Sequence, residues 1–199
     1  MADAGRVIAG SAKGVRLAAP GPGTRPLADR VKQTLFAVLE PVLEDAVVLD
    51  LFAGSGAGGI EALSRGAARA VFVEKDGGAA RVIADNLQRT GLAGRATVVR
   101  REAGAWLADA AGAAAAGPFD IVLVDPPYAD TDALVHALEL VGAHVSEDGV
   151  VIAKHFWRDA PPARSGLLAS VRERRFGETA LTFYQRAEAA PEREEAGEA

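Results

Sequence analysis

Apolar residues recur along the middle of the chain in short runs, and stretches with helical periodicity separate these runs. Runs of consecutive apolar residues are typical of strands that are buried on both faces of a sheet. They stand at 47–52, 70–74, 96–100, 119–125 and 149–156. Apolar residues three and four positions apart, ending at a glycine, indicate helices over 58–66, 77–91 and 131–142. This alternation predicts an α/β fold with a mostly parallel, Rossmann-like sheet.

The two ends of the chain show a different pattern, which predicts antiparallel strands. Residues 167–176 and 179–186 each alternate and have only Gly177 and Glu178 between them, so we expect a hairpin at the edge of the sheet. Residues 6–10 and 14–20 predict a small N-terminal β-hairpin. We therefore expect a basic hairpin and connector over 1–26, a main domain over 27–186 and an acidic, disordered tail over 187–199.

Two segments lie outside this regular alternation. Over 27–43, Val31, Leu35 and Leu39 are spaced as on one face of a helix, and Asp29 stands in the first turn, where the helix dipole favours an acid. The alanine-rich stretch 108–119 predicts a frayed helix followed by a loop.

Composition excludes several kinds of site. The 199 residues include no cysteine, so disulfides, thiolate zinc sites and cysteine nucleophiles are ruled out. The histidines, His136, His144 and His155, do not stand at metal-ligand spacing, and we expect no metal. The N-terminus lacks a signal-peptide pattern and no apolar run is long enough to span a bilayer, so we expect a cytoplasmic protein without a membrane partner.

The net charge of −5 conceals a basic N-terminal segment. Up to Leu35, six basic residues stand against two acidic ones, whereas the chain from Arg186 onward is acidic. Such a segment either contacts a nucleic-acid backbone or is only a solvated surface. The six basic residues are Arg6, Lys13, Arg16, Arg25, Arg30 and Lys32.

Chemistry is expected where the parallel strands end, because ligands of such sheets bind at the carboxyl edge. After the first strand, Gly54, Gly56 and Gly59 give the pattern G-x-G-x-x-G, and Glu74 ends the next strand. This pattern fits a nicotinamide dinucleotide, with Glu74 on the ribose hydroxyls. Asp50, however, would repel a pyrophosphate. It suits a ligand with an ammonium group and no phosphate, such as S-adenosylmethionine.

The fourth strand ends in D-P-P-Y, at Asp125, Pro126, Pro127 and Tyr128. The carboxylate accepts hydrogen bonds, the prolines leave carbonyls without neighbouring N–H donors, and the ring can stack on a planar base. These groups suit an aromatic exocyclic amine, which attacks a sulfonium methyl once it is held in position. The same residues can also serve only to end a strand. Glu102, after the third strand, is expected either to face an adenine amino group or to be a surface acid.

Several of these segments resemble known methyltransferases. Residues 47–67, 72–76 and 123–128 resemble the class I, S-adenosylmethionine-dependent amino methyltransferases. The two ends of the chain point to a more specific family. Residues 6–17, 23–36 and 176–186 are similar to the bacterial methyltransferases that make N2-methylguanine in small-subunit (16S) ribosomal RNA.

The resemblance implies a reaction, a cofactor and a set of residues. The implied reaction transfers a methyl group from S-adenosylmethionine to guanine N2 of 16S ribosomal RNA, alone or in an assembled small subunit, by a monomer. The target-amine site would comprise Asp125, Pro126, Pro127 and Tyr128, and the basic N-terminal residues would bind the RNA. The cofactor site would comprise Asp50, Ala53, Gly54, Ser55, Gly56, Glu74, Glu102 and Ala103.

The chain departs from this family at three places. Ala28 stands where the family usually has a hydroxyl residue, Gly58 where it often has leucine, and the fifth strand continues as A-K-H-F-W over 153–157, where an acid is common. Three other functions stay open: an NAD-dependent oxidoreductase, which the glycine pattern suggests, a DNA amino methyltransferase, which shares D-P-P-Y, and a non-catalytic RNA-binding module.

Overall fold

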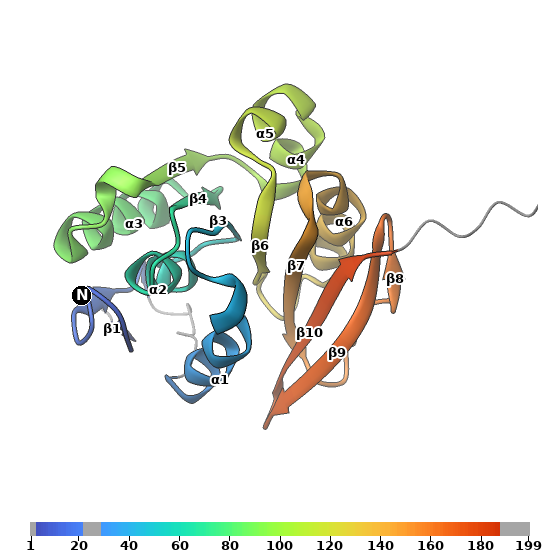
Figure 1. Cartoon of the computed structure of the whole chain (residues 1–199), viewed down its shortest axis with the longest axis horizontal. Helices are drawn as coiled ribbons and strands as arrows, with labels where there is room; N and C mark the ends of the chain where they lie inside the picture. The colour runs from blue at the N-terminus through green and yellow to red at the C-terminus, as the bar shows by residue number, and fades with distance from the viewer. Residues whose placement is uncertain (1–2, 22–28, 188–199) are drawn as a thin grey trace, which may run out of the picture.

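The computed structural model describes residues 3–21 and 29–187, and its centre is a twisted sheet in the order β5-β4-β3-β6-β7-β10-β9-β8 (Figure 1). Five strands run parallel: β3 (Val47–Leu51), β4 (Arg69–Glu74), β5 (Ala96–Arg100), β6 (Phe119–Val124) and β7 (Val145–Phe156). Antiparallel pairing adds β10 (Thr179–Arg186), β9 (Leu168–Phe176) and β8 (Arg164–Ser165). The predicted mostly parallel sheet with an edge hairpin is confirmed, and only β8 is absent from the prediction.

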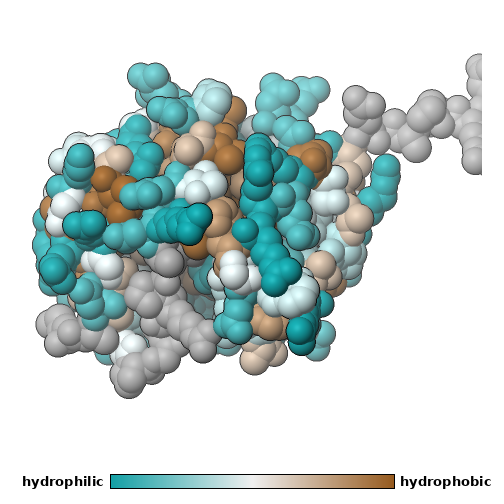
Figure 2. Space-filling model, turned by 90° about the horizontal axis from the view of Figure 1, so that it is seen from below, coloured by the Kyte–Doolittle hydropathy of each residue, from teal (hydrophilic) through white to brown (hydrophobic). Residues whose placement is uncertain are grey.

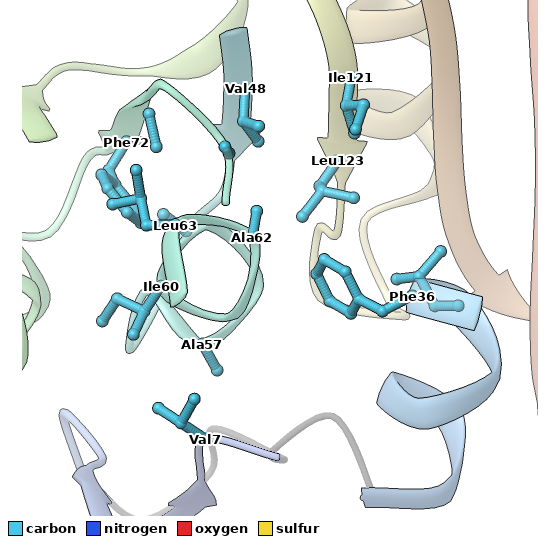
Figure 3. Packing of buried hydrophobic residues seen from close by; sticks show 14 of the residues in the cluster. Val7, Phe36, Val48, Ala57, Ile60, Ala62, Leu63, Phe72, Ile121 and Leu123 are labelled. Atoms are coloured by element: carbon cyan, nitrogen blue, oxygen red, sulfur yellow. The ribbon is translucent and has the colours of Figure 1, made fainter. Parts of the chain in front are cut away.

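Helices cover both faces of the sheet. The first face carries α1 (Asp29–Leu39), α2 (Ala57–Ser64) and α3 (Gly77–Thr90), and the second carries α4 (Ala103–Ala108), α5 (Ala110–Ala116) and α6 (Thr131–Val141). Successive strand residues point to opposite faces, so Val48 packs in the first core and Leu49 in the second. Figure 3 shows the first core, where Phe36 of α1 lies beside Leu123 of β6. Three short 3₁₀ turns complete the elements, at Glu40–Val42, Ala93–Arg95 and Gly142–His144.

The alanine-rich stretch is more helical than its composition predicts. It contains the end of α4 and the whole of α5, and Asp109 separates the two helices. The Asp109 carboxylate accepts a hydrogen bond from the Gly112 N–H at 3.3 Å and so caps α5. A short polar residue among the alanines therefore starts a second helix where the prediction has a loop.

The N-terminal segment packs against α2. Its strands β1 (Asp3–Arg6) and β2 (Arg16–Ala18) form the predicted small hairpin, and Val7 lies in the first core, near Ala57 of α2 (Figure 3). The Glu61 carboxylate accepts hydrogen bonds from the N–H groups of Ile8 at 2.8 Å and Ala9 at 3.0 Å. The side chains of α2 thus satisfy the backbone between the two strands. The end of the predicted unit 1–26 lies outside the described residues, as do Arg25, Ala28 and the tail from residue 188.

Lys32 is a structural residue, which corrects its prediction as an RNA contact. Its side chain has no exposed surface, its ammonium group donates to the Arg6 carbonyl at 2.5 Å, and it lies 4.0 Å from the Glu61 carboxylate. Burial lowers the pKa of Lys32, while Glu61 opposes that shift. A lysine enclosed in this way cannot reach a phosphate.

Among residues 3–21 and 29–187, none of the helices combines the length and the apolar character that crossing a bilayer requires.

Candidate active site

A cavity of about 700 Å³ lies at the carboxyl ends of the parallel strands. Figure 2 views the molecule from this side. Its wall brings together most of the residues that the sequence singles out, although they come from four different strand ends. These are Asp50, Ala53, Gly54, Ser55, Glu74, Ala103, Asp125, Pro126, Pro127 and Tyr128. A volume of this size is typical of small-molecule sites.

Glu74 organises the turn between β3 and α2. One carboxylate oxygen accepts from the Gly54 N–H at 2.9 Å and the other from the Asp76 N–H at 2.8 Å. Gly54 adopts a left-handed φ of 55°, which glycine tolerates without strain. Because Glu74 already uses the Gly54 N–H, this donor is not available to a pyrophosphate. The turn therefore argues against the dinucleotide interpretation of the glycine pattern.

The other glycines let α2 approach the sheet closely. A Cβ atom on Gly59 would lie 2.4 Å from the Phe72 ring, and one on Gly58 would lie 2.6 Å from the Leu123 side chain. The sequence departs from the family pattern at Gly58. The Leu123 side chain occupies the space that a larger residue at this position would need. Gly56 is the left-handed N-cap of α2 and is not on the cavity wall.

Asp50 is a buried carboxyl group at the base of the cavity. One of its oxygens accepts from the Gly59 N–H at 2.8 Å. Burial raises the pKa of Asp50 to about 7, the Gly59 hydrogen bond opposes the rise, and the carboxylates of Asp125 and Glu74 add to it. A cationic ligand in the cavity would favour the charged form of such a group. The electrostatics of this half of the cavity therefore suit a cation.

Asp125 is held by a lysine that the sequence analysis does not select. The Lys154 ammonium group of β7 donates to Asp125 Oδ1 at 2.5 Å and lies 5.2 Å from the centre of the Tyr128 ring. The structure records no partner for Asp125 Oδ2 within the described residues, so this oxygen can accept from a ligand. A signal was available: a lysine inside an apolar strand requires a partner, and Ile152 and Lys154 share one face.

The D-P-P-Y segment presents one ring and one carbonyl. The Tyr128 hydroxyl hydrogen-bonds to the Thr179 hydroxyl at 2.6 Å, which fixes the ring against β10. The Pro127 carbonyl accepts from the Asp130 N–H at 2.8 Å. Of the two proline carbonyls, only that of Pro126 has no recorded donor in the part of the chain that the structure describes. Only one of the two proline carbonyls is therefore available to bind a ligand.

Glu102 caps α4 and is not among the residues of the cavity wall, so its role as an adenine contact stays a prediction. Its two carboxylate oxygens accept from the N–H groups of Gly104 at 2.9 Å and Ala105 at 2.6 Å, so it caps α4. Partial burial acts to raise the pKa of Glu102, but these two hydrogen bonds outweigh it and the pKa is lowered. Arg101, which the sequence analysis does not select, lines the cavity in its place and pairs with Asp109 at 2.7 Å.

The basic N-terminal residues are less available than their number suggests. Arg16 pairs with Asp3 at 2.8 Å, and Arg6 pairs with Asp29 at 3.4 Å. Lys13 and Arg30 are exposed. Ion pairs therefore neutralise part of the positive charge that the sequence predicts for the N-terminal surface.

Sequence comparisons place the whole fold among methyltransferases. A family described as conserved hypothetical protein 95 matches residues 5–185. The chain is 38% identical over 184 residues to a putative rRNA methyltransferase of Bacillus subtilis, with 91% of this chain and 98% of the relative covered. It is also 38% identical over 184 residues to ribosomal RNA small subunit methyltransferase D of Escherichia coli, with 91% and 89% covered.

Solved structures agree with the sequence relatives. A putative methyltransferase from Escherichia coli superposes with a TM-score of 0.76 at 38% identity and covers 91% of this chain and 97% of its own. A putative methylase from Haemophilus influenzae has a TM-score of 0.74 at 29% identity, with 94% and 100% covered. Since the family match, the relatives and the fold all extend over nearly the full chain, this protein belongs to the family of ribosomal RNA small subunit methyltransferase D and has the class I methyltransferase fold.

Proposed function

We propose that this protein transfers a methyl group from S-adenosylmethionine to the exocyclic N2 amine of a guanine in 16S ribosomal RNA. The observation that carries the proposal is a single cavity with two chemically different halves. Asp50 and Glu74 line one half, and Asp125, Pro126 and Tyr128 line the other. The first half suits a cation with ribose hydroxyls, and the second suits a planar ring that carries an amine.

The residues of the acidic half fit S-adenosylmethionine better than a dinucleotide. Glu74 is buried and lines the cavity, where its carboxylate can accept from ribose hydroxyls. Asp50 supplies negative potential for a cation, and the Gly54 N–H, which a phosphate would need, is already bound to Glu74. The bound cofactor supplies the methyl group as a sulfonium. Ala53, Ser55 and Ala103 complete the wall proposed to hold it.

In the second half, the chain's own groups position the amine. Asp125 Oδ2 and the Pro126 carbonyl accept the two N–H bonds, which turns the nitrogen lone pair toward the methyl donor. Tyr128 stacks on the base, and its hydrogen bond to Thr179 keeps the ring in place. Lys154 fixes the Asp125 carboxylate through Oδ1. Asp125 also stabilises the positive charge that develops on the nitrogen as the methyl group arrives, until the nitrogen loses its surplus proton to solvent.

The names of the relatives support ribosomal RNA as the substrate. Arg6, Lys13, Arg16, Arg25 and Arg30 stay candidates for RNA contacts, because a phosphate backbone attracts positive charges. We infer that 16S ribosomal RNA, alone or in the assembled small subunit, is the partner.

The experiment is nucleoside mass spectrometry of 16S ribosomal RNA from cells with and without the gene, combined with methyl transfer by the purified protein in vitro. We expect one N2-methylguanine to disappear from the cells and to be restored by the protein and S-adenosylmethionine. Unchanged N2-methylguanine would overturn the proposal. Methylation of DNA, or a rise in melting temperature with NAD and not with S-adenosylmethionine, would favour the other enzyme functions.

Glu74→Gln should weaken S-adenosylmethionine binding while the fold is retained. The change removes a charged acceptor from the ribose hydroxyls, and such hydrogen bonds contribute about 1.5–3 kcal/mol, or roughly ten- to hundredfold in affinity. Titration calorimetry measures the effect. Glu139→Gln is the matched control, because this exposed carboxylate of α6 does not line the cavity and its loss should leave affinity unchanged. Unchanged affinity in Glu74→Gln, or an equal loss in both variants, would contradict the assignment of Glu74 to the ribose hydroxyls.

A further inference from the structure

The outer part of the C-terminal hairpin is an uncovered piece of the sheet. Residues 171–175 of β9 are all exposed, although neighbouring residues of a strand point to opposite faces. In the described residues, Figure 1 shows no helix over β9 on the side where α1 lies.

The strand register places two arginines of β9 on the face of the cavity. Arg174 is opposite Leu181 of β10, and Leu181 is opposite Lys154 of β7. Residues directly opposite each other share a face, and both Leu181 and Lys154 line the cavity. Two strand spacings, about 10 Å, separate Arg174 from Lys154 along this row. Arg172 lies on the same face, because it is two residues from Arg174.

The charges of β9 are segregated between its two faces. Glu173, the acid of the strand, is opposite Thr182 and points to the other face. Arg175 also lies on that other face, where its guanidinium stacks 3.6 Å from the centre of the Trp157 ring. Within the described residues, Arg172 and Arg174 form no ion pair, whereas Arg6 and Arg16 of the N-terminal segment are paired. Uncompensated positive charge beside the cavity is therefore found on β9.

We propose that this arginine face of β9, Arg172 and Arg174, binds the RNA phosphodiester backbone next to the target nucleotide. The proposal rests on the function proposed above. A guanine whose amine enters the cavity must leave its stack, so the backbone beside it has to cross the rim. Guanidinium groups bind phosphate oxygens through two parallel hydrogen bonds, which suits a rim that holds a strand without reading its sequence.

Charged side chains on an edge strand also have an explanation that involves no ligand. They prevent the free edge from pairing with another chain and causing aggregation. This explanation requires charge on the strand, but it does not require the arginines on the cavity face and the acid on the other. It predicts that removing the arginines changes solubility and leaves RNA affinity as it was.

The test compares the double variant Arg172→Gln/Arg174→Gln with the double variant Arg69→Gln/Arg186→Gln. The control removes the same charge from two exposed arginines at the amino ends of the parallel strands, opposite the cavity. Arg69 is the first residue of β4, and Arg186 donates to the carbonyl of Val145, the first residue of β7. The measurements are the Kd for 16S ribosomal RNA and for small subunits across a salt series, the Kd for S-adenosylmethionine, and the melting temperature. We expect the β9 variant to bind roughly tenfold more weakly, with a log–log salt slope flatter by about 1.4 for two lost single-strand contacts.

Each outcome separates this inference from the proposed function. If the β9 variant has the RNA affinity and salt slope of the wild type, while the wild type methylates ribosomal RNA, the inference is overturned and the function stands. If both double variants lose affinity equally, the effect is one of net charge and the inference is also overturned. If the wild type does not methylate ribosomal RNA at all, the proposed function fails first. Unchanged cofactor affinity and melting temperature in the β9 variant would show that the loss is local to RNA.

Discussion

Asp125→Ala is expected to abolish most methyl transfer while S-adenosylmethionine still binds. The substitution removes the carboxylate that accepts from the target amine and stabilises its developing charge, whereas the contacts proposed for the cofactor lie on the other half of the cavity. Losing one such preorganised electrostatic group commonly costs on the order of 10²–10³ in kcat. Single-turnover transfer of labelled methyl to 16S ribosomal RNA measures the chemical step, and calorimetry measures the cofactor.

The neighbouring lysine needs its own control, because Asp125→Ala leaves the Lys154 ammonium group without its partner. The Lys154 side chain is only 13% exposed, so an unpaired charge there could disturb the site by itself. The double variant Asp125→Ala/Lys154→Met removes both members of the pair. We expect it to be as inactive as the single variant. Recovery of activity in the double variant would mean that the unpaired lysine, and not the missing carboxylate, caused the loss.

Glu61→Ala is expected to be the most destabilising single substitution away from the cavity. The Glu61 side chain has no exposed surface and accepts from the N–H groups of Ile8 and Ala9 and from Arg65 at 2.7 Å, beside the buried Lys32. Removing one partner of a buried charge pair costs about 3–5 kcal/mol, because the other charge is left uncompensated. Denaturant unfolding should show this loss, and for a chain of this size Tm should fall by roughly 6–20 °C.

The matched comparison for Glu61→Ala is the double variant Glu61→Leu/Lys32→Met. It replaces the buried pair by apolar residues of similar size, and such replacements are often nearly neutral in stability. We expect the double variant to unfold at a higher denaturant concentration than Glu61→Ala. Equal destabilisation in the two proteins would contradict the view that Lys32 and Glu61 act together.

The sequence predicts the sheet well because strand and helix periodicity are local properties. Apolar runs at 47–52 and 119–125 correspond closely to β3 and β6, and the alternating C-terminal segments form β9 and β10. The strand ends then follow, and with them Asp50, Glu74 and Asp125 in one cavity. The strands and the residues at their ends can therefore be predicted without knowing any long-range contact.

Other features depend on side-chain partners far apart in the chain, and these escape the sequence. Lys32 precedes Phe36 by four residues and so shares its buried helix face, but its partner Glu61 lies in another helix. Glu102 has no capping signature in sequence, since glutamate is not among the preferred N-cap residues. The position of Lys154 in an apolar strand indicates that it needs a partner, but only the register of β6 and β7 identifies that partner as Asp125. The sequence shows where these charged residues stand, but it does not show which groups they bind.

One side chain joins the N-terminal segment to the cofactor turn. Asn86 of α3, which is fully buried, accepts from the Ala18 N–H and donates to the carbonyls of Ala18 and Ser55, each at 2.9 Å. Ser55 belongs to the turn that would close on the cofactor, and Ala18 ends the strand that leads toward the α1 helix. Free-energy coupling between two binding sites is reciprocal. If a ligand at the turn stabilises the N-terminal strand through Asn86, then an RNA that stabilises this strand must favour the ligand-bound turn by the same free energy.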